Sequence, residues 1–140
     1  MVILGKSFPF SRDPALTYRS LGEDRLVLAA PQGHPWASTG QASFTDAERR
    51  TLIRFAGDCP LATYVDEFLL RNRIDFGEQV ETDEIELAKN LAEAGVGVLI
   101  TSSLSVQGSI ASGRLAPVML EGMDDMSWEI QCVYSSSKGL

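Results

Sequence analysis

The sequence LAKNLAEAGVGVLI, residues 87–100, contains a helix pattern, a stop and a strand pattern in direct succession. Apolar residues recur at helical spacing up to Gly95, which stands where a left-handed residue commonly ends a helix. Residues 96–100 then form a short apolar run typical of a strand that is buried on both faces. This stretch therefore predicts a helix followed immediately by a buried strand.

The same alternation continues along the chain in both directions. Strand patterns lie at residues 25–30, 52–55, 77–81, 96–100, 115–120 and 127–134, and helix patterns at about 45–50, 60–69, 83–94 and 101–112. Thr45 with Glu48, and Thr82 and Asp83 with Glu86, have the spacing of helix capping signatures. Alternating strands and helices predict an α/β fold with a mostly parallel sheet and helices on both faces.

The charge and the cysteine content limit the partners of this segment. The chain has 140 residues and a formal net charge of -7, which argues against direct binding of nucleic acid or of an anionic membrane. Its apolar runs are shorter than the roughly 18 residues of a membrane helix, and its start does not resemble a signal peptide. Cys59 and Cys132 lie too far apart for a CxxC pair. We expect a cytoplasmic protein without membrane contact.

Catalysis and metal binding have little support in the sequence. A single histidine, His34, excludes a multi-histidine metal site, and no glycine-rich phosphate loop is present. The acidic run between Asp75 and Glu86 lacks the regular ligand spacing of a calcium loop. Cys59 with His34 as its base is a weak candidate for nucleophilic catalysis, because His34 precedes a proline in a turn. We expect no enzyme activity, no cofactor and no metal.

Three junctions between a strand and the following helix carry small or hydroxyl-bearing residues. In an open α/β sheet, ligands bind beyond the carboxyl ends of strands, where helix N-termini offer free amides. This pattern favours a small anionic ligand. The expected binding residues are Phe55, Ala56, Gly57, Asp58, Cys59 and Pro60 at the first junction, Thr82 and Asp83 at the second, and Thr101 and Ser102 at the third.

An ordered set of motifs resembles the effector-binding domain of LysR-type transcriptional regulators. The set comprises LVLAAP at 26–31, HPWA at 34–37, SFTD at 43–46, the stretch at 87–100, SIASGRL at 109–115 and IQCVY at 130–134. The resemblance extends from about residue 2 to residue 138. It implies one lobe of a fold similar to type II periplasmic binding proteins, in which a ligand lies between two lobes joined by two crossing strands.

The resemblance also implies a division of the chain. Residues 1–24 would be the tail of a first lobe, residues 25–134 the second lobe, and residues 135–140 a truncated C-terminal tail. Residues 26–30 and 130–134 would be the crossing strands. The implied partners are a small-molecule effector, further copies of the chain in a dimer or larger oligomer, and DNA only through a helix-turn-helix domain absent from this chain.

The sequence departs from the family pattern at a few positions. Thr101 stands where the family often has proline, and Trp36 stands where leucine is common. Cys59 corresponds to the reactive cysteine of peroxide-sensing members, but Phe68 and Leu69 lie where its partner cysteine is expected. Two alternatives stay open at this point: a lobe of a solute-binding protein for transport, and a thiol-based redox sensor that uses Cys59.

Overall fold

A computed structural model of the chain describes residues 2–5, 14–56, 60–123 and 126–135, which fold as an α/β structure. The strands are β1 (Val2–Gly5), β2 (Leu16–Pro31), β3 (Gln41–Ala42), β4 (Thr51–Phe55), β5 (Glu78–Thr82), β6 (Val98–Ser102), β7 (Leu115–Leu120) and β8 (Ser127–Ser135). The helices are α1 (Pro35–Thr39), α2 (Phe44–Ala47), α3 (Pro60–Arg71), α4 (Ile85–Glu93) and α5 (Ser103–Ala111). The α/β class expected from the sequence is confirmed.

The sheet is mixed, with a parallel and an antiparallel part. Its main order is β1-β8-β2-β6-β4-β5, and β7 pairs with both β2 and β3. The pairs β4–β5, β4–β6 and β3–β7 are parallel, whereas every pair that involves β2 or β8 is antiparallel. The expected parallel sheet is therefore only partly confirmed, because β2 runs in the opposite direction to its neighbour β6.

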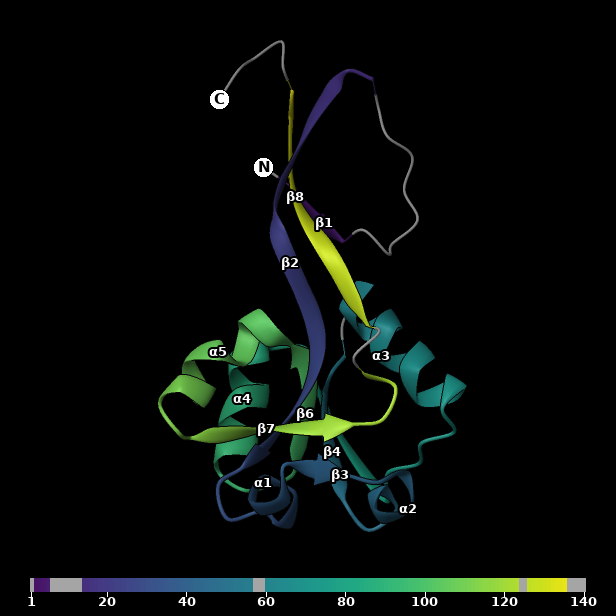
Figure 1. Cartoon of the computed structure of the whole chain (residues 1–140), viewed down its shortest axis with the longest axis vertical. Coiled ribbons are helices and arrows are strands. Elements are labelled where there is room, and N and C mark those ends of the chain that lie inside the picture. The colour runs from purple at the N-terminus through teal and green to yellow at the C-terminus, as the bar shows by residue number, and fades with distance from the viewer. Residues whose placement is uncertain (1, 6–13, 57–59, 124–125, 136–140) are drawn as a thin grey trace.

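A long antiparallel ladder extends away from the helices (Figure 1). Its β2–β8 register runs from Leu16 opposite Ser135 to Arg25 opposite Ser127, and β1 pairs along the other edge of β8. We call this ladder, formed by β1, residues 16–25 of β2, and β8, the stalk. Residues 26–30, the first expected crossing strand, continue β2 beyond the stalk and pair with β6 and β7.

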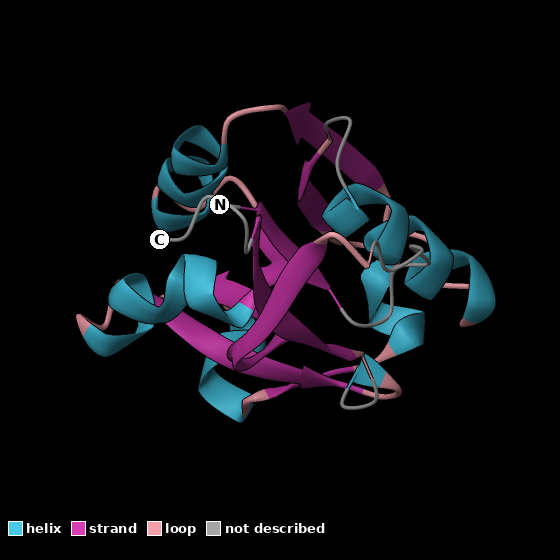
Figure 2. Cartoon of the chain, turned by 90° about the horizontal axis from the view of Figure 1, so that it is seen from above, coloured by secondary structure: helices cyan, strands magenta, loops and turns pink. Residues whose placement is uncertain are grey.

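The core lies on both faces of the sheet, and Figure 2 shows helices on both sides. Successive residues of a strand point to opposite faces, so neighbours in β6 contribute to different clusters. Ile100 packs with Leu28 and Phe68 on the α3 side, and Leu99 packs with Ile53 and Val106 on the side of α4 and α5. The two clusters together fix the parallel strands between two layers of helix.

The helix ends correct two expectations from the sequence. Ser43, not Thr45, is the N-cap of α2, and its Oγ accepts a hydrogen bond from the Asp46 N–H at 3.3 Å. The N-cap of α4 is Glu84, and Thr82 instead accepts from the Glu84 N–H at 3.1 Å. Two hydroxyl residues near one helix start offer alternative caps, and the sequence does not indicate which one the chain geometry selects. Gly95 ends α4 with φ +88°, as expected.

Candidate functional site

The carboxyl ends of β4, β5 and β6 meet at one edge of the sheet. Phe55 pairs with Thr82 and Arg54 with Ile100, and the Ala56 N–H donates to the Thr82 carbonyl at 2.8 Å. We call Phe55, Ala56, Thr82, Thr101 and Ser102 the strand-end edge. It lies at the foot of the stalk, because Ser102 pairs with Leu26, next to the last residue of the β2–β8 ladder.

The structure places seven of the ten expected binding residues on or beside this edge. Phe55, Ala56 and Thr82 are half-buried, Asp83 is exposed, and Thr101 and Ser102 are buried. Pro60 is the first residue of α3. The other three, residues 57–59, lie outside the described residues, and with them the expected role of Cys59.

Thr101 combines complete burial with an unused hydroxyl. Its exposed fraction is 0%, and its Oγ1 has no hydrogen-bond partner among the residues that the structure describes. Thr101 pairs with Val27 of β2, whose side chain is apolar. A buried hydroxyl without a partner has lost its hydrogen bonds to water, at a cost of about 1–3 kcal/mol. The strand-end edge therefore contains a buried hydroxyl that no described residue uses.

Replacing Thr101 by valine is expected to raise the free energy of unfolding by about 1 kcal/mol. Valine keeps the branched shape and removes the unpaired hydroxyl. The matched control is Ser109→Ala, because the buried Ser109 hydroxyl donates to Glu93 at 2.7 Å and its removal should be destabilising. Urea denaturation of both variants compares how the loss of each hydroxyl changes the free energy of unfolding. Equal destabilisation by both substitutions would contradict the assignment of Thr101 as unpaired.

The N-terminus of α5, at the same edge, is occupied by side chains of this chain. Ser102 is the N-cap, and its Oγ accepts from the Ser105 N–H at 3.3 Å. Asp24 Oδ1 accepts from the Leu104 N–H at 3.2 Å and from the Arg25 N–H at 2.8 Å. Sequence reasoning missed Asp24, because it lies in a polar segment without an apolar pattern and contacts a residue distant in the sequence. Only its acidic side chain, suited to a helix N-terminus, offered a signal.

A hollow of about 570 Å³ lies between α3 and β5, and none of the expected binding residues line it. Its lining residues are Arg54, Asp66, Leu69, Leu70, Arg73, Ile74, Asp75 and Gln79. The Arg54 guanidinium forms an ion pair with Asp66 and approaches the Gln79 side chain at 3.5 Å. The Arg54 guanidinium of this hollow is thus already paired within the chain.

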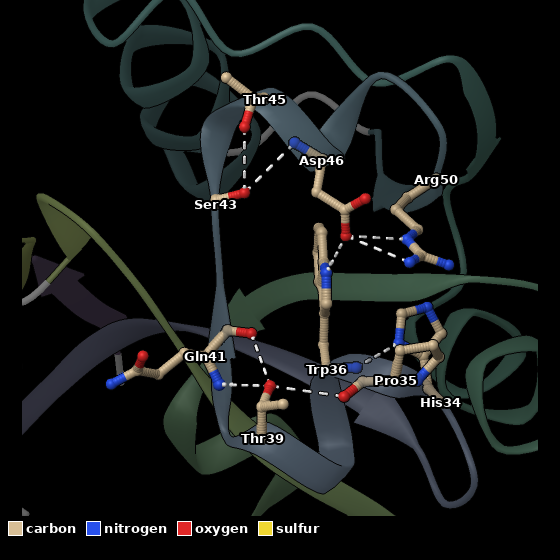
Figure 3. Close-up of polar contacts among 9 residues, drawn as sticks. All are labelled: His34, Pro35, Trp36, Thr39, Gln41, Ser43, Thr45, Asp46 and Arg50. Carbon is tan, nitrogen blue, oxygen red and sulfur yellow. Dashed lines mark hydrogen bonds and ion pairs between the residues drawn. The ribbon is translucent and has the colours of Figure 1, made fainter.

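A third group of polar contacts joins α1 to α2 at the end of the molecule opposite the stalk (Figures 1 and 3). The Trp36 Nε1–H donates to Asp46 at 2.5 Å, and Arg50 forms an ion pair with the same carboxylate at 3.1 Å. His34 Nδ1 accepts from the Trp36 N–H at 3.0 Å and so caps α1. The position far from the strand-end edge indicates a structural role for this group.

The His34 cap makes stability depend on pH. Partial burial and the nearby Arg50 lower the pKa of His34 below 6.5, and the Trp36 and Arg50 contacts lower the pKa of Asp46 below 3.8. In both cases the unfolded state binds the proton more readily. The stability that these two groups contribute is therefore fully present above about pH 6.5. It falls on acidification, first through protonation of His34 and then, below about pH 4, through protonation of Asp46.

We expect a lower urea midpoint at pH 5.5 than at pH 7.5, because protonation removes the Nδ1 acceptor and adds repulsion from Arg50. His34 is the only histidine of the chain. His34→Asn is the matched control, since asparagine also caps helices but does not titrate. In this variant, the urea midpoints at pH 5.5 and pH 7.5 should differ much less than in the wild type. An undiminished difference in His34→Asn would show that other groups cause it.

Among residues 2–5, 14–56, 60–123 and 126–135, no three His, Cys, Asp or Glu side chains are grouped so that they could hold a metal ion. In that part of the chain, no helix combines the length and the apolar character needed to cross a membrane. Cys132 is a free, buried thiol in β8.

Comparison of the sequence with protein families and with individual relatives gives a consistent result. The family model of the LysR substrate binding domain matches residues 1–140. A probable RuBisCO transcriptional regulator of Cyanophora paradoxa is 27% identical over 118 residues, which cover 82% of this chain and 36% of the relative. A protein of the same description from Porphyra purpurea is 26% identical over 126 residues, 88% of this chain and 40% of the relative. The chain thus spans well under half the length of these curated relatives.

Solved structures share the fold at low sequence identity. The Synechocystis CcmR regulatory domain in complex with 2-PG has a TM-score of 0.77 at 17% identity, with 99% of this chain and 64% of that chain covered. The effector binding domain of QuiR in complex with shikimate has a TM-score of 0.69 at 16% identity, with 96% and 62% covered. These likenesses support the same α/β lobe architecture.

Proposed function

This chain belongs to the LysR substrate-binding domain family, and from that premise we propose that it senses a small-molecule effector at the strand-end edge. The family is one of transcriptional regulators, so the effector would control transcription by the complete protein. Contact with DNA would come from a helix-turn-helix domain outside this chain. The chain itself would act by binding, without catalysis, in the cytoplasm.

The observation that carries this proposal is the meeting of three strand ends at the foot of the stalk. Parallel strands β4, β5 and β6 bring Phe55, Thr82 and Thr101 to one edge. Such edges are the usual place for ligands in open α/β sheets. Thr101 adds an unpartnered hydroxyl among the described residues, and the stalk leads away from the same edge.

The expected division of the chain remains part of the proposal. Residues 1–24 would belong to a first lobe, residues 25–134 would form the second lobe, and residues 135–140 would be a C-terminal tail. The chain covers 62–64% of the CcmR and QuiR regulatory chains, and this partial coverage supports assigning most of it to one of two lobes. The stalk strands would cross between the lobes, and the effector would lie between them.

We further propose that complete proteins containing this chain form dimers or larger species. The stalk exposes Leu21 and, less strongly, Leu16, and exposed apolar side chains favour association. Neither a transport protein nor a thiol sensor receives support from the comparisons, and Cys59 lies outside the described residues.

The first experiment is a search for the effector with the complete regulator. 2-PG and shikimate, the molecules in the CcmR and QuiR structures, are the first probes, within a panel of small carboxylates, phosphates and polyols. A stabilising ligand raises the unfolding temperature in a concentration-dependent way. The proposal predicts at least one such ligand, with affinity much weaker in the isolated chain because the first lobe would supply the other half of the cleft. A ligand that binds the isolated chain as tightly as the complete regulator would contradict a two-lobed site.

A further inference from the structure

A smaller hollow lies at the foot of the stalk, beside the strand-end edge. Its volume is about 260 Å³, and its lining residues are Glu23, Asp24, Arg25, Ser103, Leu104 and Ser127. These residues come from β2, from the first turn of α5 and from the start of β8. Since Leu26 pairs with Ser102, the hollow adjoins one end of the proposed effector site.

Asp24 is the buried charged residue of this hollow. Its exposed fraction is 7%, and its Oδ1 accepts from the backbone N–H groups of Leu104 and Arg25. Among the described residues, no hydrogen bond engages its second oxygen, Oδ2. The carboxylate therefore occupies the helix end with one oxygen, and its other oxygen remains an acceptor for a ligand.

We propose that Asp24 determines which chemical groups of an effector enter this end of the site. A free helix N-terminus attracts anions, but at α5 the Asp24 carboxylate already fills that role. A second anion close to it would be repelled, whereas a hydroxyl or an ammonium group can donate to Oδ2. The effector thus presents a hydrogen-bond donor to the hollow, and any negative charge that it carries lies elsewhere. This inference rests on the proposed function, because it concerns the same site.

The other charges near the site agree with this selection. Glu23 adds a second carboxylate to the hollow, while Arg25 is exposed to solvent at its rim. The α4 N-terminus also carries carboxylates, with Glu84 at the N-cap and Glu86 in the first turn. The N-termini of α4 and α5 therefore both have carboxylate side chains of this chain beside them.

The test is a pair of titrations on the isotope-labelled chain, followed through the amide signals of Ser103, Leu104 and Ser105. Inorganic phosphate is the anionic probe, and methylammonium chloride, compared with sodium chloride, is the donor probe. The variants are Asp24→Ala, which opens the helix end, and Asp24→Asn, which removes the charge at nearly constant volume. Glu48→Ala is the matched control, since it removes an equal charge from an exposed position at the end of α2, at the end of the molecule opposite the stalk.

We expect phosphate to bind Asp24→Ala with a dissociation constant about tenfold lower than in the wild type, as measured from the shifts of these amide signals. Asp24→Asn should change in the same direction, and Glu48→Ala should resemble the wild type. Methylammonium should shift the signals in the wild type and lose this effect in both Asp24 variants. Equal phosphate affinity in the wild type and the Asp24 variants would overturn the proposal, and so would a wild type that does not respond to methylammonium. Neither titration uses the effector, so their outcome is separate from that of the effector search.

Discussion

Replacing Phe68 by alanine is expected to lower the free energy of unfolding by about 3–5 kcal/mol. The Phe68 ring on α3 is completely buried in the cluster that contains Leu28 and Ile100. Truncation removes this apolar contact and leaves a cavity between α3 and the sheet, which backbone relaxation fills only in part.

Urea denaturation of the isolated chain measures the effect, with Leu70→Ala as the matched control. Leu70 lies on the same helix but is 79% exposed, so its truncation should change stability by no more than about 0.5 kcal/mol. A loss in Phe68→Ala as small as that of the control would mean that α3 does not pack on the sheet as described.

Replacing Gly97 by alanine is expected to destabilise the fold by about 1–3 kcal/mol or more. A Cβ at this position would lie 2.4 Å from the Thr51 carbonyl oxygen and 3.0 Å from its carbon. Both atoms belong to the backbone at the start of β4, so relief requires the turn before β6 to move away from β4. This movement disturbs the two strands that supply Phe55 and Thr101 to the strand-end edge.

Gly108→Ala provides the control for this prediction. Gly108 lies inside α5, and apart from the backbone of that helix no described atom lies within 4 Å of an added Cβ, so alanine should stabilise the helix by about 0.5–1 kcal/mol. Opposite signs for the two substitutions, measured by urea denaturation, would confirm the close approach at Gly97. A neutral or stabilising Gly97→Ala would contradict it.

The apolar patterns of the sequence predicted most of the lobe. Continuous apolar runs are visible without knowledge of the partner strands, which is why residues 52–55 and 96–100 led to β4 and β6. Gly95 marked a helix end correctly, because its effect is local to the turn that it occupies. The elements that carry the strand-end edge were thus predictable.

The stalk and the Asp24 contact were not predictable from such patterns. The first part of β2 is largely exposed, so residues such as Arg19 and Ser20 give no apolar alternation to detect. The antiparallel direction of β2 depends on where the chain enters the lobe, and Asp24 meets Leu104 only through that tertiary arrangement. Of the candidate site, the sequence indicated the strand ends but not the carboxylate that shapes one side of them.

The most direct test of the effector site is hydrogen exchange, measured by mass spectrometry on the complete regulator with and without the ligand found in the effector search. Binding slows exchange where it stabilises backbone hydrogen bonds. The proposed site predicts protection concentrated in peptides that cover residues 52–60, 80–87 and 98–105, with weaker protection in Thr101→Val. Protection confined to peptides that line the hollow between α3 and β5, around Arg73 and Asp75, would contradict it.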